Sequence, residues 1–285
     1  MYYSKEYFSF LAPKIRMKKE AFDAVITHFD SLPPSEAENI AKHFADPSLT
    51  YVDKSPTIEK IAQKEHGDLL CVLLYMAASG YTRETYHKFG IPDSILYDSF
   101  NCLPEKMETL KRFKGYWGYP SVIWPVRIAG LEIFRIGRLS YAMERAPQDI
   151  FADGKVLIPK GGTYVHIHIA DNDKLIGCAE SINAARTFFA DFYPQYKDTV
   201  FYTRTWLLDP RLSEILSENS NILQFQKAFR IFGKIDGEEQ ILSRVFGTVE
   251  ENFDEYSAEN SLQRGILSYL KSGKRLGSGM GYTLN

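Results

Sequence analysis

The spacing of apolar residues changes partway along this chain of 285 residues, and that change limits the folds open to it. Up to about residue 110, apolar residues recur at intervals of three and four, which is typical of amphipathic helices. One such set is Phe22, Val25, Ile26 and Phe29. Beyond an aromatic, irregular stretch at 114–125, apolar and polar residues alternate as they do in strands. The length also suggests two domains.

The sequence therefore predicts an α+β chain, with an all-helical domain over residues 1–120 and a sheet-containing domain over residues 121–285. For the second domain, the expected elements are a long strand at 133–143, strands at 155–158 and 164–169, a helix at 182–192, a strand at 199–208, a helix at 211–231, a strand near 241–245 and a helix at 261–270. Because the first three strands are joined by short connections, we expect them to form an antiparallel meander.

Composition argues against two classes of partner. The formal net charge is -2, so the composition lacks the excess of positive charge that is typical of proteins that bind nucleic acid or an anionic membrane. A segment at 82–95 has the layout of a helix-turn-helix, but residues 92–102 carry two aspartates and no Lys or Arg, whereas a helix that enters a DNA groove needs cations. The longest apolar run, 69–78, is too short to span a bilayer and predicts a buried helix. We expect no nucleic-acid partner and no membrane.

The cysteines indicate the compartment. Cys71, Cys102 and Cys178 are odd in number, far apart and without metal-ligand spacing. Together with the lack of a secretory signal, this predicts reduced thiols and a cytoplasmic protein.

A strand, a polar break and a helix start follow one another between residues 163 and 189. After the alternating strand 163–170, Lys174, Gly177 and Ala179 lead into a helix. The first turn of a helix presents unpaired N–H groups and the positive end of the macrodipole, which bind a pyrophosphate. The small residues let phosphates approach the backbone. The segment resembles the coenzyme A site of GCN5-related acyltransferases, although an ordinary helix entry after a strand gives the same pattern.

Further segments carry a resemblance to a known family. They are 134–139, 165–169, 206–210, Ser181 with Ala184, Ala185, Phe188 and Phe189, and Ser220–Ile222 with Phe225 and Phe229. On these residues the chain resembles bacterial acyltransferase-like proteins, in which a helical N-terminal domain precedes a GNAT-like domain (GCN5-related N-acetyltransferase).

The resemblance implies a mixed, mostly antiparallel sheet with flanking helices. It also implies an acyl-CoA-dependent N-acyltransferase, which transfers an acyl group, acetyl in the first instance, from acetyl-CoA or another acyl-CoA. The acceptor would be a small-molecule or peptide amine, attacking directly in a ternary complex. Acceptor and oligomeric state are left open.

In such a fold the strand at 164–169 parts from the strand that begins near residue 199. Backbone amides at Ile167 and Ile169 would then hold the pantetheine arm and polarise the thioester carbonyl. Asn221 is a candidate contact to the same arm, with a role in helix capping or a turn as the alternative.

The expected proton carriers lie on the same strand. His166 and His168 share one face of it and are the candidates for the general base. Glu144 and Glu132 are the second choices. Tyr202 or Tyr164 is the candidate acid. The segment 221–229 offers Phe where related enzymes often place a catalytic Tyr, so the identity of the acid stays open.

Two other functions start from the same residues. His166 and His168, with Asp171 or Asp173 beyond them, echo the metal site of cupins. A non-catalytic module that binds acyl-CoA is the other alternative. In the tail, Lys274 and Arg275 could reach the adenosine 3′-phosphate, but the favoured interpretation of this segment is a solvated turn leading into an edge strand.

Overall fold

The structure is a computed structural model that describes residues 1–119, 123–170 and 175–283. Its contacts divide the chain into two compact units, Met1–Ile136 and Gly137–Asn285. The domain boundary predicted from the sequence, between residues 120 and 121, precedes this division and stays a prediction. None of the described helices combines the length and the apolar character that a membrane-spanning segment needs.

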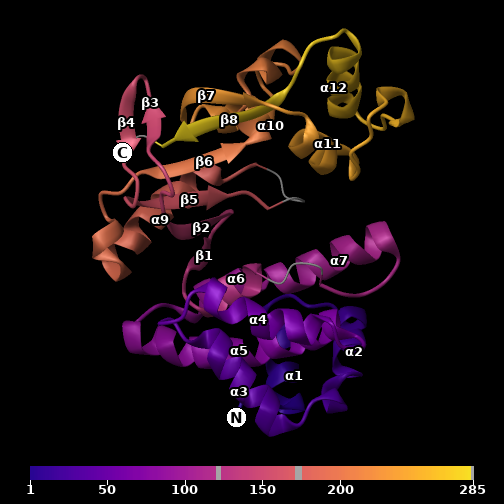
Figure 1. Cartoon of the computed structure of the whole chain (residues 1–285), viewed down its shortest axis with the longest axis vertical. Coiled ribbons are helices and arrows are strands. Elements are labelled where there is room, and N and C mark those ends of the chain that lie inside the picture. Colours follow the sequence, from indigo (N-terminus) through magenta and orange to yellow (C-terminus); the bar gives the residue numbers. More distant parts are fainter. Residues whose placement is uncertain (120–122, 171–174, 284–285) are drawn as a thin grey trace. The chain divides into compact units, whose positions relative to one another are not determined.

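The first unit is helical, and a short strand, β1 (Ile133–Ile136), ends it. Its described helices are α1 (Lys5–Lys14), α2 (Lys19–Ile26), α3 (Pro34–Ala45), α4 (Tyr51–Ala62), α5 (Gly67–Phe89), α6 (Asp93–Phe100), α7 (Cys102–Lys114) and α8 (Trp124–Ala129). Helix α5 forms its centre, with α2, α3, α4 and α8 packed around it (Figure 1). All residues from Leu70 to Ala78 are buried, because a helix that is apolar on every side requires neighbours on every side.

The segment with the helix-turn-helix layout is a packed hairpin of helices. Gly90 ends α5 in the left-handed conformation, with φ of 72°, and α6 begins at Asp93. The Asp93 carboxylate accepts a hydrogen bond from Arg83 Nε at 2.8 Å. This ion pair ties the start of α6 back to α5, so the acidic residue of the second helix serves the packing of the two helices.

The second unit contains most of a mixed sheet. Its strands are β2 (Leu139–Arg145), β5 (Thr163–His168), β6 (Phe201–Thr205), β7 (Arg230–Asp236) and β8 (Gly277–Tyr282), and the sheet order is β1-β2-β5-β6-β8-β7. β2 with β5, β6 with β8, and β7 with β8 are antiparallel. Only the β5–β6 pairing in this part of the described chain is parallel. The predicted fold class, with a mixed and mostly antiparallel sheet, is confirmed.

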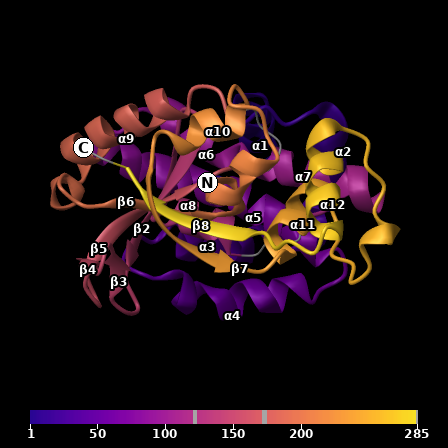
Figure 2. The ribbon, with the colours of Figure 1, turned by 90° about the horizontal axis from the view of Figure 1, so that it is seen from above.

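Helices flank this sheet. They are α9 (Cys178–Phe192), α10 (Asn221–Gln226), α11 (Glu239–Phe246) and α12 (Ser261–Lys271). β3 (Ile150–Ala152) and β4 (Lys155–Ile158) form a separate two-stranded hairpin. Figures 1 and 2 show this hairpin and the α11–α12 pair toward opposite ends of β8.

Helix α9 covers one face of the sheet. The Tyr141 hydroxyl lies 2.8 Å from Ser181 Oγ, and the ring of Phe189 packs edge-on against Phe201 at 5.7 Å between centroids. Because side chains alternate along a strand, the neighbours of Tyr141 and Phe201 along their strands point to the other face. That other face carries His166.

Several predicted elements were wrong. The long strand expected at 133–143 is two strands, because Gly137 turns the chain with φ of 62°. The expected meander does not form, because β2 pairs directly with β5 and the 150–158 hairpin stands apart. The helix expected at 211–231 is a short 3-10 turn, α10 and the start of β7. The strand expected near 241–245 is the helix α11, whose Ile241 and Leu242 are buried.

The tail was also misassigned. β8 is an internal strand between β6 and β7, not an edge strand. Its glycines, which suggested a turn, permit close packing: a Cβ on Gly279 would lie 1.9 Å from the backbone oxygen of Leu208. Glycine is therefore required where β8 crosses the 3-10 turn at Trp206–Leu208.

Candidate active site

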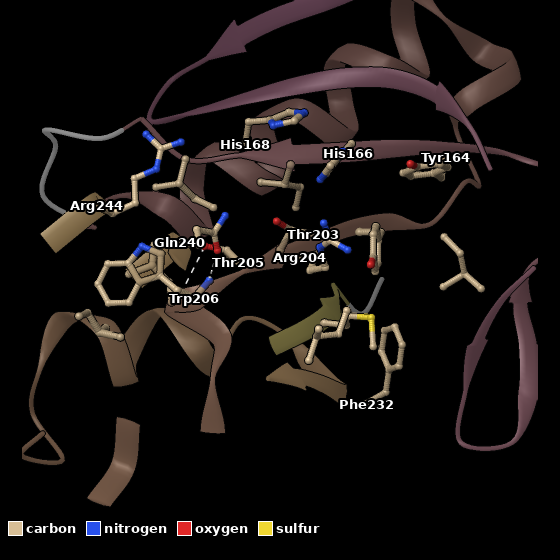
Figure 3. A pocket seen from close by; sticks show the side chains of 18 of the residues that line it. Tyr164, His166, His168, Thr203, Arg204, Thr205, Trp206, Phe232, Gln240 and Arg244 are labelled. Carbon is tan, nitrogen blue, oxygen red and sulfur yellow. Dashed lines mark hydrogen bonds between the residues drawn. The ribbon is translucent and has the colours of Figure 1, made fainter. Parts of the chain in front are cut away.

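The second unit holds a large cleft, with a volume of about 1090 Å³. This volume is slightly above the range of roughly 300–1,000 Å³ that is usual for ligand sites. Its walls come from β5 and β6, from the loop after β2, and from α10, α11, β7 and β8 (Figure 3). The elements that line it are far apart in the sequence, and the sheet brings them together.

The cleft lies along β5 and β6. His166 and Tyr202 are partners in register and therefore share one face. Ile167 and Thr203 point to the opposite face, because side chains alternate along each strand. All four line the cleft. A ligand in the cleft would thus contact both strands.

The gap exists because β5 and β6 pair over only a short distance. Their register consists of Val165 with Phe201 and His166 with Tyr202. β5 continues to His168 and β6 to Thr205, but no later pair of described residues is in register. The two strands are side by side at one end and parted at the other.

The backbone amides of alternate β5 residues face β6. The Val165 N–H donates to the Val200 carbonyl at 3.0 Å, across the β5–β6 edge. Successive amides of a strand alternate between its two edges, so the amides of Ile167 and Ile169 face the same edge. Ile169 lies beyond the last residues in register and lines the cleft. The sequence named these two residues. The register of His166 with Tyr202 engages the Ile167 amide in strand pairing, whereas Ile169 lies beyond the paired part of the edge.

A carboxylate, two imidazoles and a tyrosine meet on the cleft face of the sheet. Glu144 Oε2 accepts a hydrogen bond from the Tyr164 hydroxyl at 2.7 Å and lies 3.3 Å from His166 Nδ1. The side chains of His166 and Glu144 are each 22% exposed. The ring centroids of His166 and His168 are 4.0 Å apart. These groups meet because Glu144 is the register partner of Tyr164 and β5 alternates its side chains.

Both candidate acids lie near this group. The rings of Tyr164 and Tyr202 are 5.8 Å apart, and Tyr202 lies 5.9 Å from His166. Burial raises the pKa of Tyr202, and the positive charge of Arg204 opposes this only in part. A phenol with a raised pKa keeps its proton at neutral pH, as a proton donor must. The other predicted carboxylate, Glu132, lies in the first unit and accepts a hydrogen bond from Arg127 Nε at 2.9 Å.

The same group has the donor set of a metal site. Three possible ligand atoms, one from each of Glu144, His166 and His168, lie within 4.8 Å of one another. Two imidazoles and a carboxylate suit zinc or divalent iron. The carboxylates that the sequence suggested for such a site, Asp171 and Asp173, lie outside the described residues.

The predicted phosphate-binding segment is only partly described. Lys174 lies outside the described residues. Gly177 precedes α9 in the left-handed conformation, with φ of 82°, and Ala179 is exposed in its first turn. Glu180 shares that turn, which opposes an anion there. Neither Gly177 nor Ala179 is among the described residues that line the cleft.

Asn221 does line the cleft, at the start of α10. The capping role falls to its neighbour Ser220, whose Oγ accepts a hydrogen bond from the Leu223 N–H at 3.2 Å.

The tail cations are engaged in ion pairs: Lys274 Nζ lies 2.8 Å from Glu214, and Arg275 Nε lies 2.5 Å from Glu238. Contact of either cation with a phosphate stays a prediction.

Sequence reasoning missed several residues of the cleft. Gln240 and Arg244 of α11 line it, but their segment was predicted to be a strand. Gln240 Oε1 accepts hydrogen bonds from the Trp206 N–H at 2.7 Å and from Ser278 Oγ at 3.0 Å. It thereby fixes the end of β6 against β8. The distinctive residues 206–210 were the available signal for this part of the site.

Two family matches cover most of the chain. Residues 133–283 match the family described as the GNAT-like C-terminal domain. Residues 11–130 match the N-acyltransferase N-terminal domain. A search of the curated proteins found no significant match.

Solved structures share the fold. A crystal structure of an acyltransferase in complex with decanoyl-CoA and teicoplanin aligns with a TM-score of 0.76 and 21% identity, over 98% of this chain and 87% of that chain. An acyltransferase in complex with decanoyl-CoA aligns with a TM-score of 0.75 and 19% identity, over 98% and 88%. An acyltransferase mutant in complex with octanoyl-CoA aligns with a TM-score of 0.76 and 20% identity, over 98% and 87%.

Proposed function

The chain belongs to the family of the GNAT-like C-terminal domain and is an acyltransferase, and from that premise we propose that it transfers the acyl group of an acyl-CoA to an amine. The observation that carries the proposal is the cleft between the parted strands β5 and β6, with the Ile169 amide on one edge and the group formed by Glu144, His166 and His168 beside it.

The cleft suits both halves of a ternary complex. The pantetheine arm would lie in the gap, with Asn221 beside it and the thioester carbonyl near the amide of Ile169. This amide would stabilise the negative charge that develops on the carbonyl oxygen in the transition state. Holding amine and thioester together supplies much of the rate through orientation.

The proton transfers follow from the same geometry. As the amine nitrogen attacks the thioester carbon, His166 Nε2 accepts its proton, and Glu144 stabilises the resulting imidazolium through Nδ1. The C–S bond then breaks, and the coenzyme A thiolate receives a proton from Tyr202 or Tyr164. The products are an amide and coenzyme A. His168, which lies against His166, is the second candidate for the base.

The acyl group and the acceptor are the finer parts of the proposal. The sequence favoured acetyl transfer, but the similar structures contain octanoyl-CoA and decanoyl-CoA, so longer chains belong in any assay. One of these structures also contains teicoplanin. This supports a small-molecule or peptide acceptor that carries an amine. Lys174, Gly177 and Ala179 remain our candidates for contact with the pyrophosphate.

The direct test measures release of free thiol by the full chain from acetyl-, octanoyl- and decanoyl-CoA, over a panel of amines, with mass spectrometry of the product. We expect amine-dependent thiol release and an acylated amine. A thermal-shift series with the same thioesters reports binding, since a ligand that binds the folded state raises the melting temperature. Binding without turnover on any amine would leave a non-catalytic acyl-CoA module, and neither binding nor turnover would refute the proposal.

A metal-binding function is the second candidate, favoured by the close approach of Glu144, His166 and His168. Elemental analysis of the purified full chain tests it. Stoichiometric metal that is lost in the His168→Asn variant would support it, and a metal-free wild-type chain with acyltransferase activity would exclude it.

A further inference from the structure

The cleft differs in character between its two ends. Figure 3 shows Arg244, Gln240 and Trp206 at one end and Tyr164 and Phe232 at the other. We call the second one the apolar end. It is formed by Ile150, Tyr164, Tyr202, Phe232 and Met280, which pack in one cluster and line the cleft, and by Phe151, the neighbour of Ile150 in β3.

The side chains of the apolar end form one continuous wall. The ring of Tyr202 lies 5.8 Å from Tyr164 and 6.2 Å from Phe232. Met280 and Ile150 pack against the buried cluster that contains the two tyrosines. The wall therefore extends from β5 across the sheet to β7 and to the first strand of the hairpin.

This wall begins next to the proposed reaction centre. Tyr202 is the register partner of His166, and their rings are 5.9 Å apart. A thioester carbonyl held at the Ile169 amide would lie near this pair. An acyl chain that continues from the carbonyl along the cleft face would meet apolar side chains. An acetyl group would be too short to cover these apolar side chains.

Part of the wall is open to solvent. Phe151 is 56% exposed although it lines the cleft. Its cross-strand partner in the hairpin, Val156, is 48% exposed and is not among the described residues that line the cleft. Apolar surface that water covers in the free protein favours an apolar ligand, because binding removes that surface from water.

We propose that the apolar end is an acyl-chain subsite for medium-chain thioesters of the octanoyl class, with Phe151 and Met280 as residues that determine chain length. The proposal rests on the proposed function. The polar end, with Gln240, Arg244 and Asn221, would receive the amide- and phosphate-bearing part of coenzyme A. The alternative occupant of the apolar end is the acceptor, and binding measurements without any amine separate the two.

Isothermal titration of the full chain with octanoyl-CoA and acetyl-CoA, in the absence of amine, tests the subsite. We expect wild type to bind octanoyl-CoA at least about tenfold more tightly, since each buried methylene adds to affinity. Met280→Trp fills the subsite and Phe151→Ser removes part of its wall. Both should reduce the ratio of the two affinities at least about threefold and leave acetyl-CoA binding unchanged. Val156→Ser, on the same hairpin but outside the cleft lining, is the matched control and should keep the wild-type ratio.

Each other outcome counts against the subsite. Equal affinities of wild type for the two thioesters, or a ratio that neither Met280→Trp nor Phe151→Ser reduces, would overturn it and leave the proposed function intact. Loss of the ratio in Val156→Ser as well would show that the hairpin, not the cleft wall, sets it. Absence of binding by either thioester would instead refute the proposed function. If Met280→Trp fails to fold, Phe151→Ser against Val156→Ser decides alone.

Discussion

At the scale of single residues, the carboxylate of Glu144 is what makes His166 the candidate general base. His166 and His168 share a strand face, but Glu144 Oε2 lies 3.3 Å from the ring nitrogen of His166. A carboxylate in this position orients an imidazole and stabilises its protonated form. His166 is therefore our first candidate for the base.

We expect His166→Gln to lower kcat by about 10²–10⁴-fold, which is the usual contribution of a general base. His168→Gln, on the same strand face, is the matched comparison and should cost much less. Steady-state kinetics on the full chain with a saturating acyl-CoA measure both. The Kd for acyl-CoA should not change in either variant. A larger loss in His168→Gln would assign the base to His168.

A buried cation in the first unit gives a prediction about stability. Lys54 is fully buried, and within the described residues its Nζ has no hydrogen-bond partner. Burial lowers its pKa, although the charges of Glu132, Asp46 and Asp53 act in the opposite direction. Lys54→Met should raise the free energy of unfolding at neutral pH by about 1–3 kcal/mol, the usual cost of an unpaired buried polar group. Lys60→Met, at an exposed position on the same helix, is the control and should change it little.

The pH dependence of this difference has a definite sign. Because the pKa of Lys54 is lower in the folded state than in the unfolded state, wild type gains stability as the pH rises through the folded-state pKa toward the ordinary lysine value. The advantage of Lys54→Met is therefore full below the folded-state pKa of Lys54 and shrinks as the pH rises from there toward the ordinary lysine value. Denaturant unfolding at several pH values measures it. An advantage that grows with pH would contradict the account.

At the scale of secondary-structure elements, the glycines of β8 explain how an internal strand can have a sequence that reads as a turn. A Cβ on Gly279 would lie 1.9 Å from the Leu208 carbonyl oxygen, whereas a Cβ on Gly233 of the neighbouring strand would meet only the flexible end of Met280. The first contact is with backbone, which cannot yield without moving the 3-10 turn.

Gly279→Ala should therefore lower the free energy of unfolding by about 1–3 kcal/mol or more, the cost of overpacking. Gly233→Ala, its control in β7, should cost less, because a methionine side chain can rotate away. Chemical denaturation of both variants provides the comparison. Equal losses would show that the crossing of β8 over residues 206–208 is not tight.

The sequence predicted an element well where neighbouring residues alone decide its type, and poorly where contacts with distant segments decide it. The helical half was predicted well, because the 3.6-residue period and the apolar run at 69–78 are local signals. In the second unit, short apolar runs fit strand and helix equally, and α11 was therefore taken for a strand. Which strands pair depends on long-range contacts, so the direct β2–β5 pairing was not foreseen.

The residues of the candidate site also divide into those that the sequence predicted and those that depend on long-range contacts. His166, His168, Ile167, Ile169 and Tyr202 were named from the strand pattern and the family resemblance, and the structure brings them to one cleft. The meeting of Glu144 with His166 depends on the β2–β5 register. Phe232, Met280, Gln240 and Arg244 were missed, because each lies on an element whose type or position the sequence did not reveal.

The parted strands also allow a test of one backbone amide. Ile169→Pro removes the N–H that faces the gap, outside the paired part of β5. It should lower kcat by about 10²–10³-fold, as expected for the loss of one donor to a developing oxyanion. Ile169→Ala keeps the N–H and should retain most of the activity. Acyl-transfer assays on both variants, with circular dichroism to verify folding, compare them. Equal activities would remove this amide from the mechanism.

At the scale of the whole molecule, the chain joins a helical unit to a unit that holds the cleft. The first matches the N-acyltransferase N-terminal domain over residues 11–130, and the second matches the GNAT-like C-terminal domain over residues 133–283. The described lining of the cleft comes from the second unit. The chemistry proposed here therefore depends on how the second unit parts β5 from β6.

A crystal structure of the full chain with octanoyl-CoA would test this claim most directly. The account predicts that the pantetheine arm lies between β5 and β6, that the thioester carbonyl oxygen accepts a hydrogen bond from the Ile169 N–H, and that the acyl chain runs toward Phe232 and Met280. A thioester bound elsewhere on the molecule, or a gap closed by pairing of the two strands along their length, would contradict it.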